Sequence, residues 1–220
     1  MVPLSFSDRN FSVLPSGGLF WPDERALLLA DLHLEKGSWF ARFGQMLPPY
    51  DSEQTIDWVA DDVATCGADT VYCLGDSFHD RFGCDRLPQA ARDKLTSLTA
   101  SLDWVWITGN HDAGMIDHCG GRVVEEIEVG GLLLRHEAEH DETRPELSGH
   151  YHPKLRIKGR GRRVSRRCFV ATSRKLILPA YGAFTGGLDA NHPEILKAVG
   201  APAEAWVPIS DRLLRFPLAA

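Results

Sequence analysis

The chain has 220 residues, with 44% hydrophobic and 25% charged residues. These values lie near globular averages and exclude disorder, collagen and coiled coil as descriptions of the whole chain. A chain of this length buries roughly 70% of its unfolded surface, so it needs no metal or disulfide merely to fold. We expect a single domain over residues 1–220.

The N-terminus, the hydropathy and the cysteines indicate the compartment. No stretch approaches the roughly 20 apolar residues of a membrane helix. Residues 1–10 lack a basic segment followed by an apolar one, so no signal peptide is expected. The five cysteines are odd in number and form no close CxxC pair, which favours reduced, buried thiols over a disulfide framework or a zinc ribbon. We therefore predict a cytoplasmic protein without membrane contact. The cysteines are Cys66, Cys73, Cys84, Cys119 and Cys168.

Charge is unevenly distributed along the chain. The net charge is −6, which does not favour nucleic acid as a partner. Residues 147–188, however, contain no Asp or Glu and carry a charge of +10, so the remainder carries −16. The sequence thus predicts a basic segment on an acidic body. The basic residues are Lys154, Arg156, Lys158, Arg160, Arg162, Arg163, Arg166, Arg167, Arg174 and Lys175.

The first half of the chain alternates short apolar runs with helical windows. The window 51–66 is typical of a helix, because Asp51 can cap it, Ile56 and Val59 lie on one apolar face and Gly67 ends it. A second helix is predicted at 88–102. Strands are predicted at 11–14, 19–21, 26–30, 70–74 and 104–108, followed by a hairpin of 123–129 and 132–136.

The second half, after Leu147, has an all-β pattern. Its predicted strands cover 155–158, 168–172, 175–178, 206–209 and 213–216. A βαβ half followed by a β-rich half favours an α/β (α+β) fold of two packed β-sheets flanked by helices.

Five polar clusters follow the ends of predicted strands, at residues 30–33, 74–76, 108–112, 134–136 and 148–152. Strands of one sheet bring their carboxyl ends to one edge, where open α/β sheets place their sites. The paired side chains of Asp31-x-His33 and His150-x-His152 share a face if the backbone is extended, since a strand has a period of two. We therefore expect seven side chains in one small volume: Asp31, His33, Asp76, Asn110, His136, His150 and His152.

This donor set is sufficient for two divalent metals about 3.5–4 Å apart. Asp76 is central in the order and is the expected bridge. Imidazole, carboxylate and amide donors suit Mn²⁺ or Fe²⁺, and also Zn²⁺, better than an ion that prefers thiolates. No cysteine lies in these clusters, which argues against a structural zinc site. Each motif alone is also common in turns or on surfaces, so the prediction depends on their joint occurrence.

The order Asp-x-His, Gly-Asp, Gly-Asn-His-Asp, His, Gly-His-x-His resembles that of the calcineurin-like metallophosphoesterases. The resemblance implies a four-layer αββα sandwich that holds two metals. It implies that His111 is the catalytic histidine and that Asp112 orients it. One metal would take Asp31, His33, Asp76 and His152, and the other would take Asp76, Asn110, His136 and His150.

Segments 30–33, 74–79 and especially 178–187 (LPAYGAFTGG) are similar to the DNA-ligase-associated branch, the DNA damage response endonucleases or phosphoesterases of bacteria. This resemblance implies a manganese-dependent endonuclease that acts mainly on single-stranded DNA in repair, associated with a ligase, a helicase and a nuclease. The sequence departs from the branch at Glu35, where a glycine is expected, and at Glu137-Ala138, where a proline is expected nearby. Neither departure is expected to touch a ligand.

The metals imply a mechanism. A hydroxide that bridges two divalent ions is a nucleophile at neutral pH and attacks phosphorus in line with the leaving oxygen. His111 would stabilise or protonate that oxygen.

The substrate residues are predicted from the basic segment, which can track a phosphate backbone or simply solvate a hairpin. The aromatic residues of this segment either stack on bases, if they are exposed, or pack in the core. The leading interpretation is a DNA endonuclease; the alternatives are a small-molecule phosphoesterase for nucleotides or sugar phosphates and a DNA-binding protein without activity. Trp39, Trp58, Trp104 and Trp106 are expected in the core. The candidate substrate residues are His79, Arg160, Arg162, Arg163, Arg166, Tyr181 and Phe184.

Overall fold

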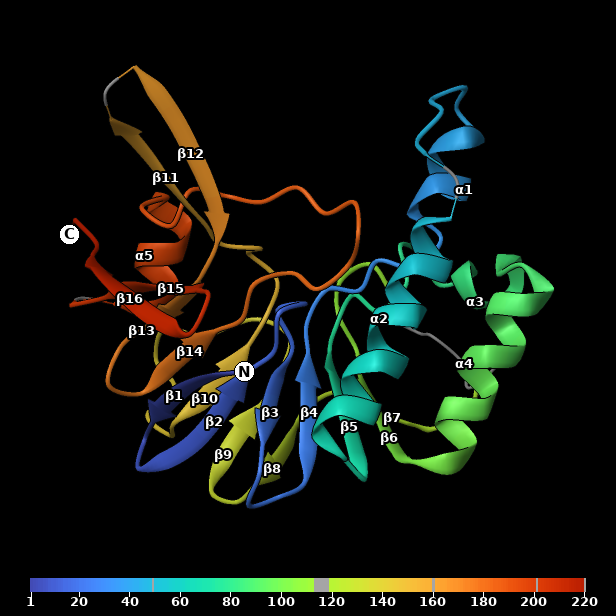
Figure 1. The fold of residues 1–220 in the computed structure, drawn as a ribbon, viewed down its shortest axis with the longest axis horizontal. Helices are drawn as coiled ribbons and strands as arrows, with labels where there is room; N and C mark the ends of the chain where they lie inside the picture. The colour runs from blue at the N-terminus through green and yellow to red at the C-terminus, as the bar shows by residue number, and fades with distance from the viewer. Residues whose placement is uncertain (49, 113–118, 160, 201, 220) are drawn as a thin grey trace.

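A computed structural model describes residues 1–48, 50–112, 119–159, 161–200 and 202–219. Two seven-stranded sheets dominate these residues (Figure 1). The strands of the first sheet follow chain order, antiparallel from β1 to β4 and parallel from β4 to β7. They are β1 (Val2–Phe6), β2 (Arg9–Val13), β3 (Leu19–Trp21), β4 (Ala26–Leu29), β5 (Thr70–Leu74), β6 (Asp103–Ile107) and β7 (Arg122–Val124).

The second sheet has the order β16-β15-β13-β14-β10-β9-β8, with β14, β10 and β9 parallel to one another. A separate antiparallel hairpin, β11–β12, projects from the sandwich (Figure 1). The strands are β8 (Ile127–Val129), β9 (Leu132–Leu134), β10 (Glu146–Ser148), β11 (Lys154–Gly159), β12 (Arg162–Arg167), β13 (Phe169–Ala171), β14 (Lys175–Ile177), β15 (Glu204–Ile209) and β16 (Arg212–Pro217).

The two sheets pack face to face and helices cover their outer faces. Leu28 and Leu74 of the first sheet share a buried cluster with Leu134 and Leu147 of the second. The outer face of the first sheet is covered by α2 (Asp51–Cys66) and α4 (Gln89–Ser101), and that of the second by α5 (Pro193–Val199). The predicted four-layer αββα fold is confirmed. Within the described ranges, no helix combines the length and apolar character needed to cross a membrane.

Both faces of the central strands are covered, and their sequences reflect this. All four residues of β4 are buried, because a strand whose sheet is covered on both faces has no solvent face. Helix α2 has its predicted bounds and ends at Gly67, which adopts a left-handed conformation with φ 67°. Asp51, however, is not the N-cap; its carboxylate accepts a hydrogen bond from the Gly37 amide at 2.8 Å.

Several elements differ from the sequence prediction. The segment 123–129, predicted as one strand, is divided between β7 in the first sheet and β8 in the second. Helix α5 interrupts the half predicted to be all β. Strands β1, β10 and β12 and the short helices α1 (Lys36–Ala41) and α3 (Gly83–Arg86) were not among the predicted elements. Short elements carry too few periodic residues to be distinguished from loops.

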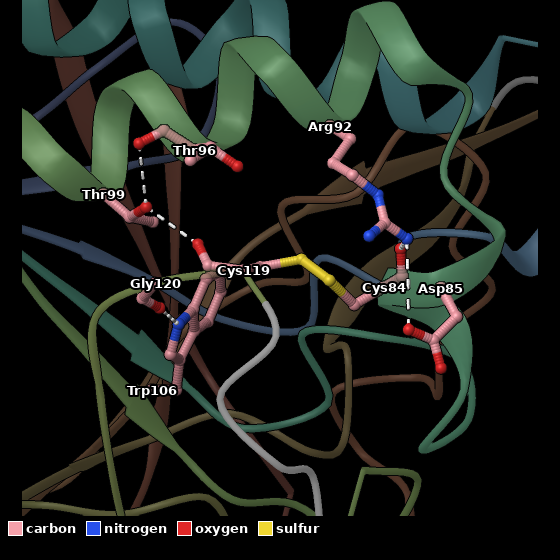
Figure 2. The surroundings of a disulfide bond; sticks show 8 residues. All are labelled: Cys84, Asp85, Arg92, Thr96, Thr99, Trp106, Cys119 and Gly120. Carbon is pink, nitrogen blue, oxygen red and sulfur yellow. Dashed lines mark hydrogen bonds and ion pairs between the residues drawn. A yellow bond between two sulfur atoms is a disulfide. The ribbon is translucent and has the colours of Figure 1, made fainter.

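The prediction of five reduced thiols is wrong for one pair. Cys84 on α3 and Cys119 form a disulfide with a Cα–Cα distance of 6.4 Å (Figure 2). Around it, the Thr99 hydroxyl on α4 donates to the Cys119 carbonyl at 2.8 Å, and the Trp106 indole donates to the Gly120 carbonyl at 2.7 Å. The disulfide joins residues 35 apart in sequence, so spacing alone did not reveal it. Cys66, Cys73 and Cys168 are free.

Candidate metal centre

The seven predicted ligands lie in loops at the carboxyl ends of strands from both sheets. Asp31 and His33 follow β4, Asp76 follows β5 and Asn110 follows β6. The second sheet contributes the remaining three, after β9 and β10. The structure brings all seven together. The three from the second sheet are His136, His150 and His152.

The ligand atoms form two adjacent groups. In the first, His33 Nε2 lies 3.1 Å from His152 Nε2, which lies 3.3 Å from Asp31 Oδ1. All three atoms lie within 4.8 Å of one another. These residues match one of the two ligand sets that the family resemblance implies.

The second group contains His136, His150, Asn110 and Asp76. Asn110 Oδ1 lies 3.0 Å from His136 Nε2 and 3.1 Å from His150 Nδ1. Asp76 Oδ2 lies 3.5 Å from His136 Nε2 and 3.9 Å from His33 Nε2 of the first group. Asp76 therefore lies between the two groups, where a bridging carboxylate is needed.

The donor chemistry fits bound cations. His136 Nδ1 donates to the Leu74 carbonyl at 3.0 Å, which leaves a lone pair on Nε2 in the neutral ring. That lone pair faces a second acceptor, Asn110 Oδ1, at 3.0 Å. Two acceptors at this distance repel each other unless a cation lies between them. Ligands each about 2.1 Å from one ion stand roughly 3.0–3.4 Å apart, as these do.

Burial favours the metal-binding form of His33. Burial, reinforced by the neighbouring rings of His152 and His111, holds the pKa of His33 far below its ordinary value. The ring is therefore neutral and offers a lone pair.

The backbone of the centre is strained where ligands are presented. Five of the seven residues have positive φ: Asp31 54°, His33 46°, Asp76 48°, His150 73° and His152 47°. Each such non-glycine conformation costs on the order of 1–3 kcal/mol and clusters at functional sites. The expectation that Asp31-x-His33 and His150-x-His152 are extended pairs is therefore wrong. Their side chains converge because the loops turn sharply, not because of a strand pleat.

Two glycines leave the space that these ligands occupy. A Cβ on Gly109 would lie 2.3 Å from Asp76 Oδ1, and a Cβ on Gly75 would lie 2.2 Å from His136 Nδ1. Gly75 also has φ 79°, which L side chains rarely adopt. Glycine at both positions is required by close packing around the ligands.

His111 lies at the mouth of the centre. Its Nδ1 lies 3.1 Å from the His79 carbonyl and its Nε2 lies 4.0 Å from Asp76 Oδ2. The carbonyl, rather than Asp112, is thus its orienting partner. Asp112 instead accepts hydrogen bonds from the backbone of Gly109 and Ser77, both at 2.7 Å. Its buried carboxylate links the loops after β5 and β6.

Glu137, one of the two departures from the branch, does contact a ligand. Its Oε1 lies 3.7 Å from His150 Nε2 and accepts a hydrogen bond from the Tyr151 hydroxyl at 2.9 Å. At 3.7 Å the carboxylate is an ion-pair neighbour of the far nitrogen of His150 and not its hydrogen-bond partner. Its position next to His136 was the only sequence signal for this role. The other departure, Glu35, is buried against Ser52.

The predicted substrate residues have different environments. Arg162, Arg163 and Arg166 are exposed on β12, whereas Arg160 lies outside the described residues. Phe184 is 43% exposed. His79 is buried and its ring stacks on His111 with centroids 4.9 Å apart.

The prediction that Tyr181 binds substrate is wrong. It is 1% exposed and its hydroxyl donates to Asp62 at 2.9 Å, so it cannot stack on a base. Its amide donates to the Ala30 carbonyl at 2.8 Å, and the Gly182 amide donates to the Asp31 carbonyl at 3.2 Å. The segment 178–187 therefore supports the loop that carries the first two ligands.

Comparisons with known proteins agree with this geometry. A family model of the calcineurin-like phosphoesterases matches residues 24–189. Among solved structures, the Pseudomonas putida nuclease MPE is 27% identical with a TM-score of 0.74, over 93% of this chain and 95% of that chain. Curated protein sequences include no match.

Two further solved structures are more distantly similar to this chain. The Aquifex aeolicus protein AQ665 is 15% identical with a TM-score of 0.40, over 58% of this chain and 78% of that chain. The E. coli phosphoesterase Yfce is 13% identical with a TM-score of 0.37, over 82% of this chain and 86% of that chain.

The family match includes every predicted ligand and most of the 220 residues. The sandwich fold and the two ligand groups that share Asp76 are independent of that match. Sequence, fold and site therefore agree, and the chain belongs to the calcineurin-like phosphoesterase family, as a metal-dependent phosphoesterase.

Proposed function

We propose that this protein is a two-metal, manganese-dependent endonuclease that cuts DNA, mainly single-stranded DNA, in DNA repair. The observation that carries the proposal is the pair of ligand groups joined by Asp76. Imidazole, carboxylate and amide donors favour Mn²⁺ over thiolate-preferring ions. We place the enzyme in the cytoplasm as one domain over residues 1–220, in association with a DNA ligase, a helicase and a nuclease.

When bound, the two ions supply a nucleophile from water and neutralise charge on the phosphate. Asp31, His33, Asp76 and His152 would hold one ion, and Asp76, Asn110, His136 and His150 the other. The chain's own contribution is to turn these imidazoles so that a ring nitrogen of each faces the centre. His136 is oriented by the Leu74 carbonyl, and the Glu137 carboxylate lies 3.7 Å from the far nitrogen of His150.

His111 is proposed to protonate the leaving oxygen. Its Nδ1 contacts the His79 carbonyl, so Nε2 is the nitrogen that faces the centre. In the imidazolium form, which donates Nδ1–H to that carbonyl, the proton on Nε2 can pass to the departing 3′ or 5′ oxygen, which is a poor leaving group when unprotonated. Stacking on His79 keeps the ring in this orientation.

Hairpin β11–β12 supports a polyanionic substrate. Arg163 lies directly opposite Lys158 in its ladder, and like charges in that position destabilise a hairpin. A nucleic-acid backbone relieves this repulsion and releases counterions. A small phosphate ester needs far fewer cations. The similar Pseudomonas putida protein is named a nuclease, which agrees with this choice.

The test is a nicking assay on circular single-stranded DNA with Mn²⁺, Mg²⁺, Zn²⁺ or chelator. We expect manganese-dependent linearisation that is lost in His111→Ala. A parallel assay on a small chromogenic phosphodiester reports whether the metal centre is active. If the circle survives while the chromogenic diester is hydrolysed, the DNA substrate is wrong and a small-molecule phosphoesterase takes its place.

A further inference from the structure

A run of aromatic rings leads from the metal centre to the surface of α1. His79 stacks on His111 at an interplanar angle of 25°. Trp39 lies 4.9 Å from His79, and Phe43 lies 4.9 Å from Trp39, between ring centroids. Phe40 stacks on the other side of His79 at 5.5 Å. The metal centre is therefore connected to the surface by contacting rings, and we call Trp39, Phe40 and Phe43 the α1 wall.

The outer end of the α1 wall leaves large apolar side chains in solvent, although burying them would stabilise the fold. Phe43 is 63% exposed, and Met46 and Tyr50 farther along the same segment are 85% and 69% exposed. Trp39 was expected in the core but is only half-buried. Several large, exposed apolar side chains on one short segment are typical of a binding surface.

Cations accompany these rings. Arg42 precedes Phe43 in the chain and is exposed, and the Arg81 guanidinium lies 4.6 Å above the exposed ring of Phe82, in the segment that follows His79. Aromatic faces combined with cations are typical of surfaces that bind unpaired nucleic acid, since bases stack on the rings while cations bind phosphates. Figure 1 shows that α1 extends beyond the carboxyl end of β4, and hairpin β11–β12 projects on the same side of the sandwich.

We propose that the α1 wall binds unpaired bases of the strand whose phosphate lies at the metal centre. The inference rests on the proposed function and deepens it, because it names the feature that selects single strands. Bases in a duplex are stacked and paired with one another and cannot turn onto the wall. Continuity with His111 and the adjacent cations favour a nucleic acid over a second copy of this chain as the occupant.

The experiment measures competition against a small chromogenic phosphodiester, hydrolysed by the manganese-loaded enzyme. The competitors are oligothymidylate and an abasic oligonucleotide of the same length, and the readout is the ratio of their inhibition constants. We expect the wild type to prefer oligothymidylate by about 5- to 100-fold, the range of base–aromatic stacking. Phe43→Ala should reduce this ratio at least fivefold, whereas Phe43→Tyr, which keeps a stacking ring, and the distant surface variant Leu214→Ala should retain it.

The proposal is contradicted if the ratio of inhibition constants is near one in the wild type. It is also contradicted if Phe43→Ala leaves the wild-type ratio unchanged. An equal loss of affinity for both competitors in Phe43→Ala also overturns it, because the residue then does not act on bases. Dimers in size-exclusion chromatography that dissociate in Phe43→Ala overturn it in favour of self-association. Gels of the same oligonucleotides test the proposed function separately. If the strands stay intact but the wild type still prefers oligothymidylate, the endonuclease is contradicted and base binding by the α1 wall is supported. If the strands are cut but the ratio of inhibition constants is near one, the endonuclease is supported and the α1 wall is contradicted.

Discussion

Individual residues of the metal centre are limited by space as well as by chemistry. A methyl group at Gly109 would overlap the Asp76 carboxylate and backbone amide, at 2.3 Å and 2.5 Å. We expect Gly109→Ala to lower manganese affinity at least tenfold, because the proposed bridging ligand must move. Isothermal titration calorimetry measures this. Gly186→Ala, where a Cβ meets nothing within 4 Å, is the matched control and should bind manganese normally.

His111 makes a second residue-scale prediction. If it protonates the leaving oxygen, His111→Ala should lower kcat on DNA by about 10²- to 10⁴-fold. Loss on an activated nitrophenyl diester should be much smaller, because a nitrophenolate leaves without a proton. The comparison of kcat on the two substrates, with manganese affinity as a check, measures this difference. Equal losses would mean that His111 acts on the phosphate or the ligands instead.

At the scale of elements, hairpin β11–β12 contributes charge rather than core. All six residues of β12 are outside the buried core, and Arg162, Arg163 and Arg166 are exposed. Replacing Arg162, Arg163 and Arg166 with alanine should weaken single-strand binding. It should also lower the slope of log affinity against log salt by about 2, since each phosphate contact on a single strand contributes about 0.7.

Fluorescence anisotropy at several salt concentrations measures this slope. Arg122→Ala, at the opposite end of the first sheet where β7 begins, is the control for loss of an arginine. A slope unchanged in the hairpin variant would mean that these arginines only solvate the hairpin.

At the scale of the whole molecule, one buried acid links the second sheet to its helical layer. Glu146 of β10 is 0% exposed. It lies 3.6 Å from Lys175 Nζ and 3.7 Å from Arg135 Nη1. Lys175 Nζ also donates to the Ala198 carbonyl in α5 at 2.9 Å. Burial raises the pKa of Glu146 to about 7, despite these two cations.

Because the folded pKa lies above that of the unfolded chain, the folded protein holds the proton longer. The free energy of unfolding should therefore fall as pH rises from about 4.5 to about 7, by about 3 kcal/mol from this group. Glu146→Gln should remove that part of the slope. Urea denaturation between pH 5 and pH 8 measures it, with the exposed Glu128→Gln as control. A slope that persists in Glu146→Gln assigns it to other groups.

The sequence determined the layers and the identity of the centre. Each candidate ligand directly follows an apolar run, and buried parallel strands must end at one edge, so local pattern was sufficient to bring Asp31, Asp76 and Asn110 together. The bounds of α2 followed in the same way from periodicity and Gly67. The short elements β1, α1 and α3 were missed because a few residues show no period.

Tertiary structure alone decided the features that depend on distant contacts. Tyr181 is buried because Asp62, far away in the chain, accepts its hydroxyl, and the Cys84–Cys119 disulfide forms because α3 and the loop after β6 meet. Asp and His adopt left-handed backbone more readily than most residues, but the turns at these five ligands are held by packing around the centre. The aromatic wall on α1 depends on His79 reaching Trp39 across the fold. A one-dimensional pattern specifies which side chains face inward, but not which of them meet.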